Sequence, residues 1–214
     1  MNITILGSGD VGRTLAAGLA GRGHRVTVGS RTPQRQDLRD WATANDVGVS
    51  SSSDAAGAAE VVFLATAWEG AENALRLAGV SNLAGTTLVD VTNPLQFTDR
   101  LELAIGHTDS GGEQVQRWAP DANVVKAFNT VGFELMIDPE IDDGPPTMFL
   151  AGDDAGAKTT VSSLAQQLGW HVHDCGDLRA ARLTEPLALL WIQHALGTGS
   201  RGHAFRMLSS ASSS

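Results

Sequence analysis

The chain has 214 residues, of which 42% are apolar and 18% are charged, and its formal net charge is −9. This composition is typical of a globular protein with one substantial core, and the acidic balance argues against general binding to nucleic acid or to anionic membranes. The single cysteine excludes an intrachain disulfide, and there is no apolar run of about 18 residues that could span a membrane, so we expect a cytoplasmic protein.

The N-terminal segment combines a strand, a glycine turn and a helix. The apolar run Ile3–Leu6 predicts a buried strand, and the helix follows over Val11–Arg22. Three glycines lie between the strand and the helix or at the start of the helix. Gly7 permits a sharp turn, Gly9 permits close approach of a pyrophosphate and Gly12 permits tight packing of the helix on the strand. The helix N-terminus directs free N–H groups toward the phosphates. The predicted dinucleotide-binding motif consists of Gly7, Ser8, Gly9, Asp10, Val11 and Gly12.

The second predicted strand, Arg25–Gly29, ends without an acidic residue. In NAD sites of this type, Asp or Glu about twenty residues after the glycines binds the ribose 2′-hydroxyl. This chain has Ser30 and Arg31 at that point, and Arg35 follows. A hydroxyl and guanidinium groups attract a 2′-phosphate, which a carboxylate would repel. The pattern therefore predicts NADP(H) rather than NAD(H).

Strands and helices alternate along the rest of the chain. The predicted strands are Val47–Ser50, Val61–Ala65, Thr86–Val91, Asn123–Phe128, Thr147–Gly152 and Trp170–Asp174, and Val61–Ala65 is a continuous apolar run. The predicted helices are Gln34–Asn45, a brief helix from Ser53, Glu69–Ala78, Gly112–Ala119, Ala155–Leu168 and Arg179–Leu196. This alternation predicts an α/β Rossmann fold, with a doubly wound, mostly parallel sheet and helices on both faces.

A change of character at Asp138–Pro146 suggests a domain boundary, because this segment contains four acidic residues, one Gly and three Pro. We divide the chain into an NADP-binding Rossmann domain (1–146) and a small C-terminal lobe packed on it (147–208). A serine-rich segment at 209–214 is predicted to be a flexible tail.

Polar and aromatic residues follow three of the strands at their carboxyl ends. In an open parallel sheet, ligands bind outside these ends. Amides, hydroxyls and aromatic rings there suit a flat, neutral nicotinamide. The candidate contacts with cofactor or substrate are Thr66, Ala67, Trp68, Asn93, Pro94 and Ala127.

The sequence shows no evident acid–base or nucleophile pair and no set of metal ligands. We therefore predict no catalytic side chain and no metal. Hydride transfer between two ring cofactors requires little more than their alignment. A reductase of a small carbonyl or imine would need a proton donor, for which Lys126 is the best-placed residue, while the roles of His107 and His203 stay open. A third alternative is a non-catalytic NADP(H) sensor that signals redox state to a partner protein.

Several of these motifs together resemble the NADPH:coenzyme F420 oxidoreductase family, and the cytosolic reductase domains of STEAP metalloreductases are similar. Beside the glycine motif, the resemblance rests on Gly29–Arg31, Asp90–Pro94, Lys126–Thr130 and the late segment Glu185–Ile192. It implies a Rossmann domain with a small C-terminal lobe, often dimeric. It also implies hydride exchange between NADP(H) and a small-molecule acceptor or donor, either coenzyme F420 or a flavin.

The resemblance also implies roles by matching position. Ser30, Arg31 and Arg35 would hold the 2′-phosphate. The pyrophosphate would lie at Ser8, Asp10 and Val11, and the nicotinamide end at Ala67, Trp68, Asn93 and Ala127. Members often have His where this chain has Gly70, so the identity of the acceptor stays open.

Overall fold

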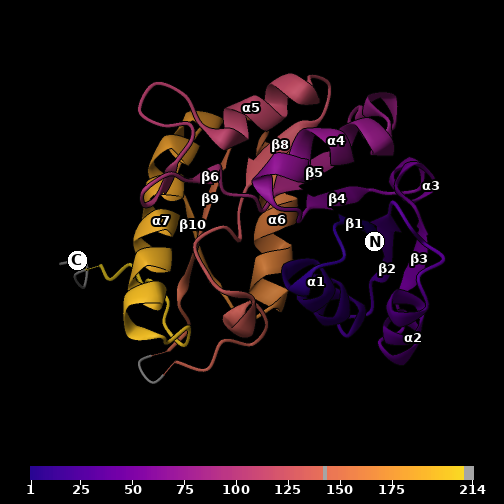
Figure 1. Ribbon diagram of the computed structural model, residues 1–214, viewed down its shortest axis with the longest axis horizontal. Helices are drawn as coiled ribbons and strands as arrows, with labels where there is room; N and C mark the ends of the chain where they lie inside the picture. The colour runs from indigo at the N-terminus through magenta and orange to yellow at the C-terminus, as the bar shows by residue number, and fades with distance from the viewer. Residues whose placement is uncertain (142–143, 210–214) are drawn as a thin grey trace, which may run out of the picture.

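The computed structural model describes residues 1–141 and 144–209, so the predicted tail lies outside the described residues from position 210 onward. Within these ranges, eight strands form one sheet in the order β10-β9-β8-β5-β4-β1-β2-β3 (Figure 1). The strands are β1 (Asn2–Leu6), β2 (Arg25–Ser30), β3 (Gly48–Ser51), β4 (Val61–Leu64), β5 (Thr87–Asp90), β8 (Asn123–Lys126), β9 (Thr147–Gly152) and β10 (His171–Asp174).

The sheet is mostly parallel, which confirms the predicted Rossmann fold. Six neighbouring strands of this sheet run parallel, in the order β8-β5-β4-β1-β2-β3. This is the strand order of a doubly wound dinucleotide-binding fold. β9 pairs antiparallel with β8, and β10 then pairs parallel with β9. The boundary predicted after residue 146 falls directly before β9, and β9 and β10 extend the same sheet.

Helices cover both faces of the sheet (Figure 1). On one face, α1 (Asp10–Ala20), α2 (Gln36–Ala44) and α6 (Ala155–Gln167) pack against the strands. On the other lie α3 (Ser52–Gly57), α4 (Trp68–Ala78) and α5 (Gly111–Trp118). The remaining helical elements are the long C-terminal α7 (Ala181–Thr198) and the short 3-10 turns η1 (Val80–Leu83), η2 (Phe133–Leu135) and η3 (Leu178–Ala180).

The central strands are buried on both faces, which explains their continuous apolar runs. In β4, Val61 and Phe63 belong to the core under α1, α2 and α6. Val62 and Leu64 belong to the core under α4 and α5, because successive side chains of a strand point to opposite faces. All four side chains are fully buried.

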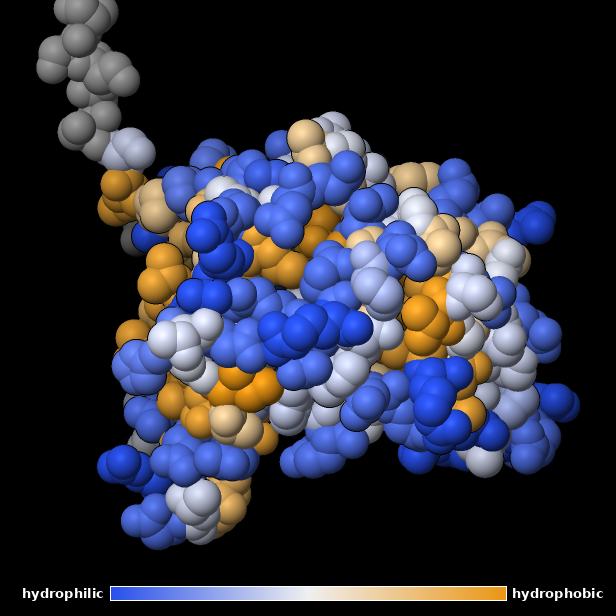
Figure 2. Space-filling model, turned by 90° about the horizontal axis from the view of Figure 1, so that it is seen from above, coloured by the Kyte–Doolittle hydropathy of each residue, from blue (hydrophilic) through white to orange (hydrophobic). Residues whose placement is uncertain are grey.

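A two-stranded hairpin, β6 (Leu95–Phe97) and β7 (Leu101–Leu103), was not predicted. Its strands are too short to show a hydrophobic period. The hairpin contacts α7, and Phe97 is 77% exposed. On α7, Leu183 and Leu190 are 73% and 57% exposed. In Figure 2, apolar side chains lie along the left edge of the view, the side on which Figure 1 places α7.

Among residues 1–141 and 144–209, none of the helices combines the length and the hydropathy that crossing a bilayer requires. Within the same ranges, the His, Cys, Asp and Glu side chains form no group of three or more that could hold a metal ion.

Candidate functional site: a cleft at the carboxyl ends of the strands

Two adjoining cavities form one cleft at the carboxyl end of the parallel strands, where the strand order reverses between β1 and β4. The first cavity, of about 320 Å³, is bounded by the ends of β1, β2 and β4. The second, of about 560 Å³, is bounded by the start of α1 and the ends of β4 and β5. The cavities share Gly9, Ala65, Thr66 and Ala67, so they are continuous.

The glycines of the turn between β1 and α1 differ in what surrounds them. Gly7 has a φ of +131°, and a Cβ on it would overlap the carbonyl group of Ala65. A Cβ on Gly12 would overlap the carbonyl group of Gly7, so these two glycines allow β1, β4 and α1 to pack closely. A Cβ on Gly9 would meet no atom within 4 Å. Gly9 therefore keeps its backbone accessible from the cleft.

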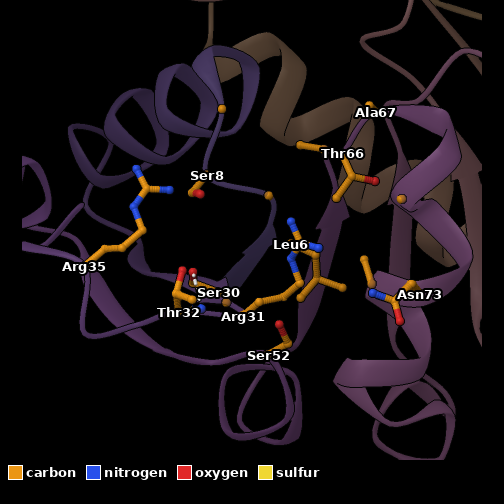
Figure 3. A pocket seen from close by; sticks show the side chains of 16 residues that line it. Leu6, Ser8, Ser30, Arg31, Thr32, Arg35, Ser52, Thr66, Ala67 and Asn73 are labelled. Carbon is orange, nitrogen blue, oxygen red and sulfur yellow. Dashed lines mark hydrogen bonds between the residues drawn. The ribbon is translucent and has the colours of Figure 1, made fainter. Parts of the chain in front are cut away.

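The end of β2 supplies hydroxyl and guanidinium groups to the first cavity. Ser30, Arg31, Thr32 and Arg35 all line it, and Figure 3 shows their side chains around the same space as Ser8. The Ser30 hydroxyl accepts a hydrogen bond from the Thr32 N–H at 3.1 Å. These groups form a cationic, hydroxyl-rich wall, and among the residues lining this cavity none is acidic.

Arg35 is held in this wall by Asp37, which lies in the first turn of α2. The Arg35 Nε donates to Asp37 Oδ1 at 3.0 Å, and the Arg13 Nη2 lies 3.2 Å from Asp37 Oδ2. Arg13 also donates from Nε to the Ser8 carbonyl oxygen at 3.0 Å. The hydrogen bond from Arg35 lowers the pKa of Asp37 to about 2. This network thus connects the glycine turn to the arginine wall through a carboxylate that stays ionised.

Lys126 is fully buried and does not line the cleft, which contradicts its interpretation as a proton donor to substrate. Its Nζ lies 2.9 Å from Asp90 Oδ2 and 2.8 Å from Glu185 Oε1. Burial by itself lowers the pKa of Lys126, but the charges of Asp90 and Glu185 outweigh that effect and raise the pKa above its usual value. Lys126 is therefore held in its charged form as part of an ion triad.

Backbone groups form further hydrogen bonds with the side chains of the triad. Glu185 accepts hydrogen bonds from the N–H groups of Gly111 and Gly112 at the start of α5, at 2.9 and 3.0 Å. Two carboxylates and one ammonium leave a net negative charge, which the free N–H groups and dipole of the α5 N-terminus offset. Lys126 also donates to the Thr92 carbonyl oxygen. The triad therefore fixes the loop that leaves β5 toward the cleft.

A pair of asparagines joins the ends of β5 and β8. Asn93 donates to the Asn129 carbonyl oxygen at 2.9 Å, and the Asn129 side chain donates to Asn93 Oδ1 at 3.1 Å. Phe128, directly before Asn129, has a φ of +61°, which is rare for a bulky residue. Asn93 lines the second cavity, whereas Asn129 is buried behind it.

Two features of the cleft fit a dinucleotide phosphate. The N-terminus of α1 begins after Gly9 without a side-chain cap, so its first N–H groups are available to a bound anion. Thr66, which lines both cavities, has a buried hydroxyl that finds no hydrogen-bond partner among the described residues. A buried hydroxyl of this kind is stabilised by a ligand that supplies the missing partner.

The sequence profile of the family described as "NADP oxidoreductase coenzyme F420-dependent" matches residues 2–94. The F420-dependent NADP reductase of Methanothermobacter marburgensis is 30% identical over 209 residues, which cover 90% of this chain and 91% of that protein. The chain belongs to the F420-dependent NADP oxidoreductase family.

Two further similarities extend across the chain. A crystal structure from Arthrobacter sp. FB24, provisionally named an F420-dependent NADP reductase, is 40% identical with a TM-score of 0.92, covering 98% of this chain and 100% of that one. Metalloreductase STEAP3 of Rattus norvegicus is 38% identical over 191 residues. The match covers 88% of this chain but 37% of the rat protein, so the chain corresponds to a minor part of that metalloreductase.

In this member of the family, most of the predicted site residues line the cleft. They are Gly7, Ser8, Gly9, Asp10, Val11, Ser30, Arg31, Arg35, Thr66, Ala67, Trp68 and Asn93. Gly12, Pro94 and Ala127 line neither cavity. Gly12 packs under the glycine turn, and Pro94 and Ala127 are buried behind the cleft.

The two histidines left open lie outside the cleft. His107 lines a separate cavity beside α7. His203 stacks on Trp191, with ring centroids 4.6 Å apart, and its Nε2 lies 3.3 Å from the Trp191 carbonyl oxygen. Both observations indicate structural surroundings rather than contact with a ligand in the cleft.

Reasoning from the sequence missed several residues that line the cleft, among them Thr32, Ser52, Asn73, Phe133 and Arg201. Thr32 directly follows the predicted Ser30–Arg31 pair, so its position was a usable signal. The other four come from segments distant in the sequence, and no local motif marks them: they are Ser52, Asn73, Phe133 and Arg201.

Proposed function

We propose that this oxidoreductase transfers a hydride between NADP(H) and a flat ring acceptor, either coenzyme F420 or a flavin. The observation that carries the proposal is the continuous cleft, whose first half has a cationic wall and whose second half is open and lined by aromatic and amide side chains. The relative from Methanothermobacter marburgensis is named an F420-dependent NADP reductase, which supports the same acceptor here.

In this proposal the adenosine half of NADP(H) occupies the first cavity. Ser30, Arg31 and Arg35 bind the 2′-phosphate, because guanidinium groups form charge-assisted hydrogen bonds with it. The pyrophosphate lies over Gly9, at the N-terminus of α1. The nicotinamide lies in the second cavity beside Trp68 and Asn93, with Pro94 and Ala127 supporting the cavity from behind.

The same cleft explains how the reaction can run without a catalytic acid. NADPH held in the cleft would supply the hydride, a deazaflavin or flavin ring would accept it, and any proton that the reduced ring takes up would come from solvent. The protein contributes the alignment of two rings and the exclusion of water between them. The buried position of Lys126 disfavours the alternative of a carbonyl or imine reductase, because no other proton donor was indicated by the sequence.

The test is a turnover assay with the purified protein, NADPH and three acceptors, namely coenzyme F420, FMN and FAD, followed at the nicotinamide absorbance band. We expect oxidation of NADPH with at least one of them, and much weaker activity with NADH. Tight NADPH binding without turnover on any acceptor would instead support the NADP(H) sensor. If neither nucleotide binds, the cofactor assignment is wrong as well.

We also propose that the protein is a homodimer and that residues 147–208 act as a C-terminal unit beside the Rossmann domain. The exposed Leu183 and Leu190 on α7, together with the exposed Phe97 of the hairpin that contacts α7, support an apolar contact surface on this side of the molecule.

A further inference from the structure

The second cavity is lined by charges of both signs, which come from different elements. Asp10 begins α1 and Glu69 lies in the first turn of α4, and both line the cavity. Arg201, from the segment that follows α7, is the one cationic residue lining this cavity in the described part of the chain. An anionic group is therefore repelled along the sides formed by α1 and α4 and attracted at the side of Arg201.

Arg201 is positioned by contacts within its own neighbourhood. Its Nε lies 3.2 Å from Glu134 Oε1, and its guanidinium carbon lies 5.5 Å from the centre of the Phe133 ring. Phe133 itself lines the second cavity. The guanidinium is thus laid over an aromatic ring at the wall of the cleft, a geometry that favours Arg over Lys.

The segment that carries Arg201 is anchored to the body of the protein. The Trp191 indole N–H donates to the His203 carbonyl oxygen at 2.7 Å. The Thr147 N–H donates to the Phe205 carbonyl oxygen at 2.9 Å, which ties the chain to the first residue of β9. Both attachments follow Arg201 closely in the chain, and α7 ends shortly before it at Thr198, so Arg201 lies on an anchored segment.

Part of the guanidinium remains free to bind a ligand. The ion pair with Glu134 uses Nε, and the side chain is 54% exposed. The two terminal amino groups form no hydrogen bond with any residue in the ranges 1–141 and 144–209. These amino groups offer the paired N–H donors that match two oxygens of a phosphate or a carboxylate.

We infer that Arg201 forms an anion subsite at the mouth of the second cavity, which selects a ring acceptor that carries a phosphate or carboxylate on a tether. The inference rests on the proposed function, since it concerns the acceptor half of the same cleft. Arg201 is a specificity-determining residue in this scheme. It binds the tether's charge, while the ring lies against the nicotinamide in the same cavity.

The test compares acceptors that share a ring and differ in the charge of the tether. FMN and riboflavin differ by one phosphate, and coenzyme F420 and its chromophore differ by the phosphate and the carboxylates of the tether. Binding is measured by quenching of acceptor fluorescence at low ionic strength, with NADP⁺ present to fill the nucleotide site and prevent turnover. We expect the phosphorylated member of a pair to bind about tenfold more tightly, the scale of a hydrogen bond to a charged group.

Variants of Arg201 test whether this residue causes the preference for the phosphorylated acceptor. Arg201→Gln should remove the roughly tenfold preference and leave binding of the phosphate-free acceptor unchanged. Arg201→Lys should retain part of the preference, because the charge remains while the paired donors are lost. The matched control is Arg179→Gln, since Arg179 is an exposed arginine paired with Asp177 beside a different cavity, and this change should have no effect.

The outcomes separate this inference from the proposed function. Equal affinity for both members of each pair, or an equal loss for both in Arg201→Gln, overturns the anion subsite, and so does the failure of all four compounds to bind. Hydride transfer to F420 that is insensitive to Arg201 also overturns it but leaves the proposed function intact. An Arg201-dependent phosphate preference in a protein that transfers no hydride supports the subsite and refutes the proposed function.

Discussion

Arg31 extends from the end of β2 into the first cavity, and within residues 1–141 and 144–209 no acid pairs with its guanidinium. Its charge is thus available to a 2′-phosphate. We expect Arg31→Ala to weaken NADPH binding by about 1–3 kcal/mol, the scale of charge-assisted hydrogen bonds, and to leave NADH binding nearly unchanged. Calorimetry measures both. Arg25, exposed at the opposite end of β2, provides the control Arg25→Ala. Equal losses for the two nucleotides would contradict the assignment.

Two glycines of the same turn should respond differently to alanine. Gly7→Ala places a Cβ against the Ala65 carbonyl group at a φ of +131°, so the free energy of unfolding should fall by roughly 1–3 kcal/mol or more. Gly9→Ala meets open space and should change stability by less than about 0.5 kcal/mol, yet weaken NADPH binding because the methyl group intrudes on the cleft. Urea unfolding and calorimetry check the two effects. Unchanged NADPH affinity in Gly9→Ala would argue against a pyrophosphate at this turn.

At the scale of elements, the ion triad of Lys126, Asp90 and Glu185 connects β5, β8, α5 and α7. Lys126→Met would leave two buried carboxylates without their cation, so we expect a loss of about 3–5 kcal/mol in the free energy of unfolding. Lys158→Met is the control, since Lys158 pairs with the half-exposed Asp174 and should cost at most about 1 kcal/mol. Similar losses for the two variants in urea unfolding would mean that the triad contributes little.

The pH dependence of the triad follows from the sign of its pKa shift. The pKa of Lys126 is raised in the folded protein, so its contribution to stability is fully present below the ordinary lysine pKa of 10.5. The contribution is lost only when the pH rises through the higher folded value. In the comparison of wild type with Lys126→Met, the stability difference should therefore be constant from neutral pH to about pH 10.

For the whole molecule, the exposed leucines of α7 bear on assembly. If the apolar side formed by Leu183 and Leu190 is a dimer contact, the double variant Leu183→Glu/Leu190→Glu should be monomeric, because it would bury four charges in a two-fold interface. Light scattering at micromolar concentrations gives the mass of each form. A wild-type protein that is already a monomer under these conditions would refute the homodimer.

How well the sequence predicts an element depends on its length and burial. The buried strand β4 was found because it is a continuous apolar run, which is typical of a strand covered on both faces of a sheet. The hairpin of β6 and β7 was missed because three residues per strand carry no period, and its stability comes from pairing and from contact with α7. The glycine turn and the arginine wall of the first cavity followed from residues 7–35, whereas Phe133 and Arg201 of the second cavity were not predicted.

The sequence by itself determined the glycine turn, the lack of an acid after the second strand and the alternation of strands and helices, because these depend on residues close together in the chain. Only the tertiary structure decided that Lys126 is buried in an ion triad with Asp90 and Glu185, away from the cleft, and that Arg201 reaches the cleft. These outcomes depend on contacts between distant segments, since burial and charge pairing arise only when α7 and the segment after it pack against the sheet.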